Sequence, residues 1–144
     1  MIHQATASNL TALSHLAIQL WPDNTPDALE SEFAQLLSDP QAALFLACSN
    51  DTPIGFAQCQ LRHDYVEGTE SSPVGYLEGI FVSEAYRHMG YARLLLAACE
   101  IWAKGNGCQE FASDCEFSNT ESLSFHLHAG FTEANRIICF TKHL

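Results

Sequence analysis

The feature of this sequence that most constrains its fold is a strand-like run followed by small residues and a long amphipathic helix. Residues 74 to 83, VGYLEGIFVS, are rich in β-branched and aromatic residues and predict a buried strand. Residues 84 to 104, EAYRHMGYARLLLAACEIWAK, place Arg87, Gly90 and Ala92 directly before an apolar helical run. The start of a helix offers unpaired N–H groups and partial positive charge, so this junction is suited to hold a phosphate.

Two common phosphate-binding patterns are absent from this junction. It lacks G-x-x-x-x-G-K-[ST], the nucleoside-triphosphate loop, and G-x-G-x-x-G, the dinucleotide loop. What remains is R-x-x-G-x-A, in which Arg87 adds a fixed charge and small residues allow close approach of a ligand. This pattern alone is weak, because ordinary helix starts also satisfy it.

The rest of the chain supplies the other elements of an α/β (α+β mixed) fold. The predicted strands are a short one in residues 1–7, three at 42–49, 54–66 and 108–115, and one or two closing strands in 131–144. Two helices precede residue 42: one is capped by Ser8 and runs to Leu20, and the other is opened by Thr25 and Pro26 and stopped by Pro40. A further helix at 119–128 has a Ser118/Glu121 capping box and Gly130 after its last turn. This order, β-α-α-β-β-β-α-β-α-β, predicts a mixed sheet with helices on both faces. At 144 residues we expect one domain, 1–144.

Composition narrows the class of protein. The six cysteines form no C-x-x-C pair and lie in apolar stretches, so reduced, buried thiols are expected (Cys48, Cys59, Cys99, Cys108, Cys115 and Cys139). No apolar run reaches membrane-spanning length, and the first ten residues show no signal-peptide pattern. A cytoplasmic protein without a membrane partner is therefore expected.

The formal net charge of −11 bears on the partner. A nucleic acid would be repelled by this field, whereas a small cationic ligand would be attracted. Acidity that serves solubility alone is the other interpretation.

The order of elements around R-x-x-G-x-A resembles the Gcn5-related N-acetyltransferase (GNAT) superfamily over essentially the whole chain. The resemblance implies a mostly antiparallel sheet with a splayed strand pair and acetyl-CoA as co-substrate. Its pyrophosphate would be held by the segment Arg87, His88, Met89, Gly90, Tyr91 and Ala92. The amides of Ile80, Phe81 and Val82 would meet its pantetheine arm and acetyl group. The later pattern of Asn119, Ser122, Gly130 and Phe131 implies a further cofactor contact at Asn119.

Three further blocks look like the short aminoglycoside 6′-N-acetyltransferases of bacteria. They are LW at 20–21, RHDYVEGTESSPVGYLEGIFV at 62–82 and EFASD at 110–114. These blocks lie outside the cofactor motif, in segments where the superfamily builds acceptor specificity. The resemblance therefore implies an enzyme that acetylates the 6′-amine of aminoglycoside antibiotics and so confers resistance.

Transfer of an acetyl group from a thioester to an amine needs a base, a donor to the oxyanion and a proton for the departing thiolate. Glu78 precedes the proposed acetyl-binding amides and can take the amine proton directly or through water. Asp114 ends the neighbouring strand, and both acids can hold a cationic amine. The N–H of Val82 is the expected oxyanion donor. His126 stands where many superfamily members have a tyrosine acid; it either donates the thiolate's proton or is a packed helix residue.

An aminoglycoside site should offer flat surfaces and acids. Trp21 and Tyr65 can stack on sugar rings and attract ammonium groups, although Trp21 is also a candidate for core packing at a helix end. The expected ammonium contacts are Glu70, Glu78, Asp114 and Glu116. Asn135 stands where relatives are expected to carry a further acid. No Cys/His cluster supports a metal site, because His126 and His128 point to different faces of one helix.

Two alternatives remain open from the sequence. The acceptor can be a polyamine or another small cationic amine, although the aromatic pair favours sugar rings. The chain can also be a non-catalytic acyl-CoA-binding regulatory module, against which Glu78 and Asp114 argue. The resemblance further implies a homodimer with the C-terminal strands at its interface.

Overall fold

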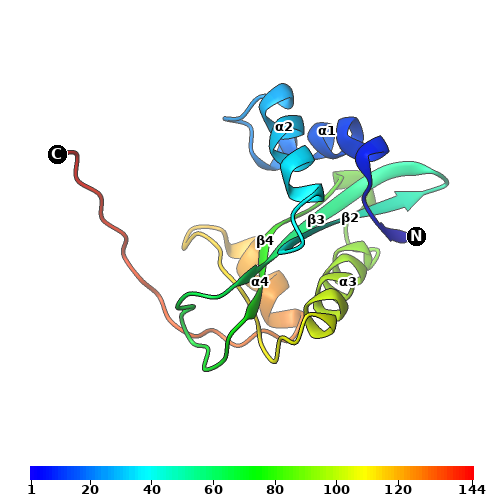
Figure 1. Cartoon of the computed structure of the whole chain (residues 1–144). Helices are drawn as coiled ribbons and strands as arrows, with labels where there is room; N and C mark the ends of the chain where they lie inside the picture. The colour runs from blue at the N-terminus through cyan, green and yellow to red at the C-terminus, as the bar shows by residue number, and fades with distance from the viewer.

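A five-stranded sheet runs through the centre of the protein, in a computed structural model that describes residues 1–144 (Figure 1). The strands are β1 (Ile2–Gln4), β2 (Ala42–Ser49), β3 (Thr52–Arg62), β4 (Val74–Val82) and β5 (Phe111–Ser113). They lie in the order β1-β2-β3-β4-β5, antiparallel throughout except that β4 and β5 are parallel. The predicted mixed, mostly antiparallel sheet is thereby confirmed.

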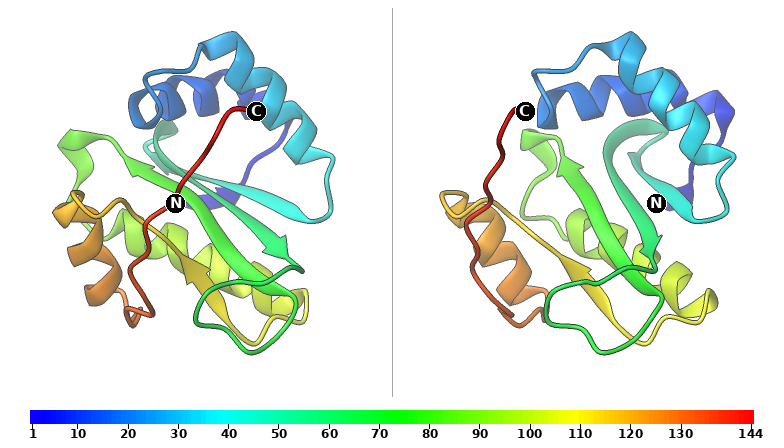
Figure 2. Two further views of the ribbon diagram at one scale, coloured as in Figure 1. Left: turned by 90° about the vertical axis from the view of Figure 1, so that its left-hand side faces the viewer. Right: turned by 60° about the vertical axis from the view of Figure 1, so that its left-hand side comes forward.

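Helices cover both faces of this sheet, as predicted (Figure 2). The helices α1 (Leu10–Leu20) and α2 (Pro26–Leu37) pack on one face, and α3 (Tyr91–Gly105) and α4 (Thr120–His128) pack on the other. Beneath α1 and α2 the core is built around Phe33 and Phe56, which are fully buried. Beneath α3, Leu95 and Cys99 are equally buried against the sheet. Two cores on opposite faces fix the sheet between two helical layers.

Local signals explain where several elements begin. The side chain of Thr25 accepts a hydrogen bond from the N–H of Ala28 at 3.2 Å, and Pro26 occupies the first turn, so α2 begins where predicted. Two predicted caps were wrong. Ser8 lies within a 3₁₀ turn, η1 (Ala7–Asn9), so α1 is entered from Asn9. At α4 the side chain of Asn119, not Ser118, accepts from the helix.

Three strands differ in length from the prediction: β1 covers only residues 2–4 of the predicted 1–7, and β3 and β5 are also shorter or shifted. Asn50 and Asp51 take positive φ angles of 47° and 64°, which makes the β2–β3 turn two residues long. The strand β3 therefore begins at Thr52 rather than 54. It ends at Arg62 rather than 66, where its pairing with β4 stops at Val74. β5 keeps only three of the eight predicted residues, because its pairing with β4 ends after Ser113.

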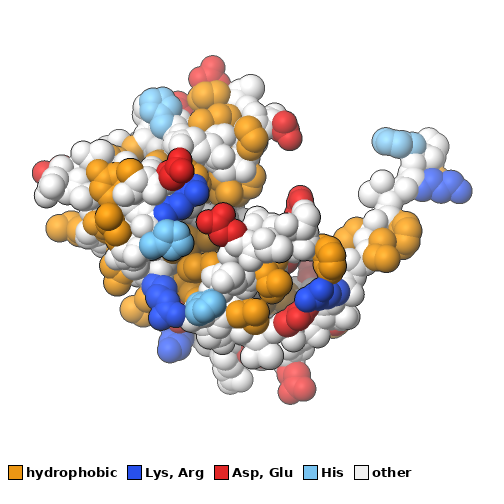
Figure 3. Space-filling view, turned by 180° about the vertical axis from the view of Figure 1, so that it is seen from behind, with side chains coloured by type: hydrophobic (Ala, Val, Ile, Leu, Met, Phe, Trp, Pro, Cys, Tyr) orange, Lys and Arg blue, Asp and Glu red, His pale blue; other side chains and the backbone are white.

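The closing strands predicted for residues 131–144 are absent, and this prediction was wrong. The segment has no regular secondary structure and its end projects away from the sheet (Figure 1). Ile137, Ile138 and Phe140 are 69%, 80% and 88% exposed, and hydrophobic side chains line the projecting segment in Figure 3. A β-rich composition indicates capacity to form a strand, but a strand also needs a partner edge, and none within this chain receives this segment.

All six cysteines are free thiols. Cys59, Cys99 and Cys108 are buried as expected, and Cys48 is half-buried. Cys115 and Cys139 are exposed, contrary to the prediction, because they lie in the loop after β5 and in the C-terminal segment. None of the helices combines the length and apolar composition needed to cross a bilayer.

Candidate active site

One edge of β4 loses its partner strand halfway along. β5 pairs only with Gly75–Leu77, so residues 78 to 82 have no neighbour on that side. On the other side, the hydrogen bond from Ser83 N to Ile54 O makes Val82 and Gly55 a non-hydrogen-bonded pair. By the alternation of an antiparallel ladder, the N–H groups of Ile80 and Val82 point towards the unpaired edge. By the same alternation the N–H of Phe81 points towards β3, so a ligand contact at this amide stays a prediction.

Glu78 lies on a β-bulge at the start of this unpaired edge. Cys59 faces Leu77 and Gln58 faces Gly79, which leaves Glu78 as the extra residue of β4. Its side chain is 21% exposed and accepts three hydrogen bonds from Arg62, at 2.9, 3.0 and 3.1 Å. The carboxylate is therefore held by a two-pronged ion pair and remains accessible from solvent.

Asp114 follows β5 directly and accepts a hydrogen bond from the hydroxyl of Tyr76. Burial raises the pKa of Tyr76, and the bond to Asp114 raises it further, so the phenol is protonated at neutral pH. The guanidinium of Arg62 lies over the ring of Tyr76, 3.4 Å from its centre. The two carboxylates predicted to share a site are thus joined through Arg62 and Tyr76.

Sequence reasoning missed Arg62 and Tyr76. Tyr76 stands two residues before Glu78 on the same strand, and this period-2 spacing is the signal that places both side chains on one face. Arg62 carries no comparable signal, because its approach to Glu78 depends on the register of β3 against β4.

Trp21, the residue after α1, packs against Gly79, which follows Glu78 on β4. A Cβ atom added at Gly79 would come within 2.6 Å of the Trp21 ring, so only glycine allows this contact. The ring also meets Phe56 edge-on, with centroids 5.8 Å apart. Trp21 is only half-buried, so it packs into the core and still presents surface next to the carboxylate.

Tyr65 and Asn135 meet at Glu67, another residue that the sequence did not single out. The hydroxyl of Tyr65 donates to Glu67 at 2.7 Å, and the amide of Asn135 donates to the same carboxylate at 3.2 Å. The hydrogen bond between Tyr65 and Glu67 raises the pKa of Tyr65 and lowers that of Glu67. The Tyr65 side chain remains exposed. Glu70 and Glu116 are exposed and make no side-chain hydrogen bond with this group or with Glu78.

The segment 87–92 forms a sharp turn into α3. His88 and Gly90 have φ angles of +62° and +91°, and Tyr91 begins the helix with no side chain capping its first N–H groups. A Cβ atom added at Gly90 would meet no protein atom within 4 Å, and the left-handed backbone of this residue favours glycine. Arg87 anchors the turn to β4, because its Nε donates to Val82 O at 2.9 Å.

Met89 in the same turn is 65% exposed, and Ala92 is half-buried in the first turn of α3. The unpaired N–H groups at this helix start carry partial positive charge, so the turn is suited to bind a phosphate or pyrophosphate.

His126 is fixed by hydrogen bonds at both ring nitrogens. Its Nδ1 donates to Ser122 O at 2.7 Å, and its Nε2 lies 2.8 Å from the Ser113 hydroxyl. Its ring also packs against Phe125 and Phe131. The histidine thereby fastens α4 to the end of β5.

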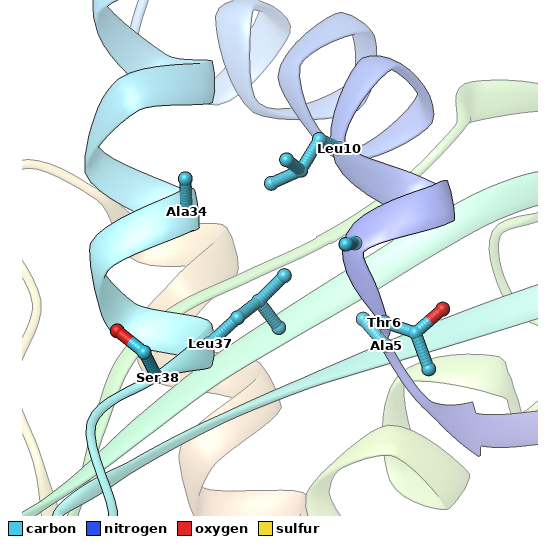
Figure 4. A pocket seen from close by; sticks show the side chains of 7 residues that line it. Ala5, Thr6, Leu10, Ala34, Leu37 and Ser38 are labelled. Carbon is cyan, nitrogen blue, oxygen red and sulfur yellow. The ribbon is translucent and has the colours of Figure 1, made fainter.

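Two open pockets of the structure lie away from these residues. The larger, about 420 Å³, lies between η1, α1 and α2, where Leu10, Ala34 and Leu37 point towards one another (Figure 4). A smaller one lies at the end of α3, near Lys104 and Phe111. Neither contains a predicted site residue. The structure brings no three His, Cys, Asp or Glu side chains together in a way that could hold a metal ion.

Comparison with known proteins places this architecture in a family. Residues 10–131 match the model of the acetyltransferase (GNAT) family. This chain belongs to the GNAT acetyltransferases, as its resemblance predicted.

Its relatives within the family carry a more specific name. A protein of Stenotrophomonas maltophilia named aminoglycoside N(6′)-acetyltransferase type 1 is 45% identical over 99% of this chain and 93% of its own length. A protein of the same name from Salmonella typhimurium is 42% identical over 93% of this chain and 94% of its own. The structure of AAC(6′)-Iy with the bisubstrate analogue CoA-S-monomethyl-acetylneamine superposes with a TM-score of 0.96, at 40% identity, over 100% of this chain and 98% of that protein.

Proposed function

We propose that this protein transfers the acetyl group of acetyl-CoA to the 6′-amine of aminoglycoside antibiotics. The observation that carries the proposal is the likeness, over nearly the full length, to relatives named for this activity. The likeness includes the strand that bears Glu78 and the loop that bears Tyr65, and both lie outside the phosphate-binding turn. The cytoplasmic location expected from the sequence stays a prediction.

Two features of this chain fit acetyl-CoA. The uncapped start of α3, with Gly90 and Arg87, offers N–H groups and a cation to the pyrophosphate. The unpaired edge of β4 offers the N–H groups of Ile80 and Val82 to the pantetheine arm and the acetyl oxygen. The Asn119 side chain caps α4, which places its proposed cofactor contact at the start of that helix.

In the proposed reaction the acceptor amine attacks the thioester carbonyl. Glu78 takes a proton from the ammonium, directly or through water, before the C–N bond forms. The N–H of Val82 stabilises the oxyanion, and the C–S bond then breaks. The thiolate takes its proton from solvent, because the Nδ1–H of His126 is donated to Ser122 O. In this proposal His126 is a packed helix residue and not the proton donor, which is one of the two roles that the sequence left open.

The acceptor would bind between the acid pair and the aromatic side chains. Asp114 and Glu78 meet ammonium groups, and Trp21 offers its exposed surface to a sugar ring. Tyr65, Glu70, Glu116 and Asn135 are proposed as outer contacts.

Neomycin and paromomycin test the function, because they differ in carrying an amine or a hydroxyl at the 6′ carbon. CoA thiol release from acetyl-CoA is expected with neomycin and not with paromomycin. Equal release with both would contradict transfer to the 6′ position. Release with spermidine alone would favour the polyamine alternative, and acetyl-CoA binding with no release to any amine would favour the regulatory one.

Replacing Gly90 by alanine is expected to weaken acetyl-CoA binding about tenfold. A left-handed alanine costs about 1–2 kcal/mol, and relaxation of the turn would move the N–H groups that face the pyrophosphate. Gly107→Ala is the matched control, since Gly107 has φ +86° and equally open surroundings but lies beyond the other end of α3. Calorimetric titration should show weaker binding in Gly90→Ala alone. Equal affinities in the two variants would exclude the turn from the cofactor site.

We also propose that the protein is a homodimer. The C-terminal segment supports this, because Ile137, Ile138 and Phe140 are exposed on an extended stretch that has no partner in its own chain. Sedimentation equilibrium is expected to give twice the chain mass, and Ile138→Asp is expected to shift the protein towards monomer. A monomeric wild-type protein at micromolar concentration would contradict the proposal.

A further inference from the structure

Arg62 reaches unusually far along the neighbouring strand. It is the last residue of β3 and lies opposite Val74, yet its guanidinium binds Glu78, four residues further along β4. Both oxygens of the carboxylate are engaged, Oε1 at 2.9 Å and Oε2 at 3.0 Å from the same nitrogen, Nη2. A fork of this kind fixes the orientation of a carboxylate, which a single contact to a lysine would not.

The same guanidinium also contacts the residue that holds the second acid. To reach Glu78, Arg62 crosses the face of Tyr76 at 3.4 Å from the ring centre. The hydroxyl at the far end of that ring donates to Asp114. The Arg62 guanidinium therefore contacts Glu78 directly and is linked to Asp114 through Tyr76.

Few other charges face Glu78. Arg62 approaches it from β3, and Tyr76, on β4 itself, separates it from Asp114 at the end of β5. On the side of α1, the residues packed at Gly79 are Leu20 and Trp21, which carry no charge. Arg62 is thus the positive charge in direct contact with the proposed base.

We propose that Arg62 is a positioning residue for the acceptor site, which sets the orientation of Glu78 and, through Tyr76, of Asp114. The inference rests on the proposed function of these two acids. Pre-orientation matters because a base displaced by about 1 Å can cost about 100-fold in rate.

The variant Arg62→Met tests the proposal, since it keeps a long side chain over Tyr76 and removes both the fork and the charge. We expect kcat with neomycin to fall about 100-fold. KM for this polycation should stay equal or fall, because the site becomes more negative.

Two further variants separate charge from geometry. Arg62→Lys keeps the charge without the fork, so its kcat should fall about tenfold, which is less than the loss in Arg62→Met. Lys104→Met makes the same change of net charge at the far end of α3, and it should alter none of these quantities. In the background of Glu78→Gln, Arg62→Met should have less than about threefold further effect on kcat/KM.

Two results would overturn the inference. A fall in thermal stability with unchanged kcat would mean that Arg62 only stabilises the pairing of β3 with β4. A rise in kcat would mean that Arg62 blocks Glu78 instead of positioning it.

Failure of the proposed function is distinguishable from failure of this inference. If the wild-type protein binds acetyl-CoA but acetylates no aminoglycoside, the function fails. The crystal structure of Arg62→Met then still decides whether Arg62 orients the acid. We expect Glu78 to turn towards solvent or to occupy several rotamers, and an unchanged single orientation would contradict the inference.

Discussion

Glu78→Gln is expected to lower kcat/KM for an aminoglycoside about 1,000-fold. An amide cannot accept the proton of the acceptor ammonium, and positioned general bases contribute roughly 10²–10⁴-fold to rate. Glutamine has nearly the same shape as glutamate at this bulge of β4, so the fold and the affinity for acetyl-CoA should be retained. Steady-state kinetics at saturating acetyl-CoA measures the loss, and calorimetry measures the affinity.

Glu32→Gln is the matched control, since Glu32 is an exposed acid on α2 that makes no contact with the site. It should leave kcat/KM unchanged. Less than a tenfold loss in Glu78→Gln would exclude this residue as the base. Undiminished turnover in both Glu78→Gln and Asp114→Asn would remove the proposed acid pair altogether.

Phe56→Ala is expected to lower the free energy of unfolding by about 3–5 kcal/mol. Phe56 is fully buried in the core beneath α1 and α2 and meets Phe33 and Trp21 edge-on, at centroid distances of 6.1 and 5.8 Å. Removing the ring leaves a cavity at the centre of this core. It also removes the support on which the Trp21 ring rests beside Glu78.

Urea denaturation measures the loss in Phe56→Ala. Phe117→Ala serves as its control, because Phe117 is 80% exposed in the loop after β5. The control should change stability by less than about 0.5 kcal/mol. A loss under about 1 kcal/mol in Phe56→Ala would contradict the two-layer core described above.

The sequence predicted the elements that depend on local pattern. Thr25 and Pro26 marked the start of α2, and the uninterrupted apolar run of residues 42–49 marked β2 at its observed bounds. In both places the signal lies in consecutive residues, so no knowledge of the tertiary structure is needed. The family assignment rested on the order of elements around the R-x-x-G-x-A motif, and the comparison with known proteins confirms it.

What the sequence missed depends on residues that meet only after folding. Arg62 contacts Glu78 because of the register between two strands and the bulge that interrupts it. Asn119 replaces Ser118 as the cap of α4 because the chain after β5 enters the helix one residue later than the capping-box spacing indicated. The C-terminal segment has the composition of a strand, but composition does not provide the partner edge that a strand requires.

The glycine of the phosphate-binding turn was predicted for an incomplete reason. The motif indicated small residues that allow close approach of a ligand, and the structure adds that Gly90 has a left-handed backbone. The location of the turn was right because strand, turn and helix follow one another in sequence. The left-handed conformation of Gly90 could be recognised only from the backbone angles of the folded chain.

The position of the transferred acetyl group tests the central claim most directly. Kanamycin A carries several amines, and NMR of the product formed from acetyl-CoA identifies which of them is acetylated. The account predicts a single product acetylated at the 6′-amine. A product acetylated at another amine, or a mixture without preference for the 6′ position, would contradict it.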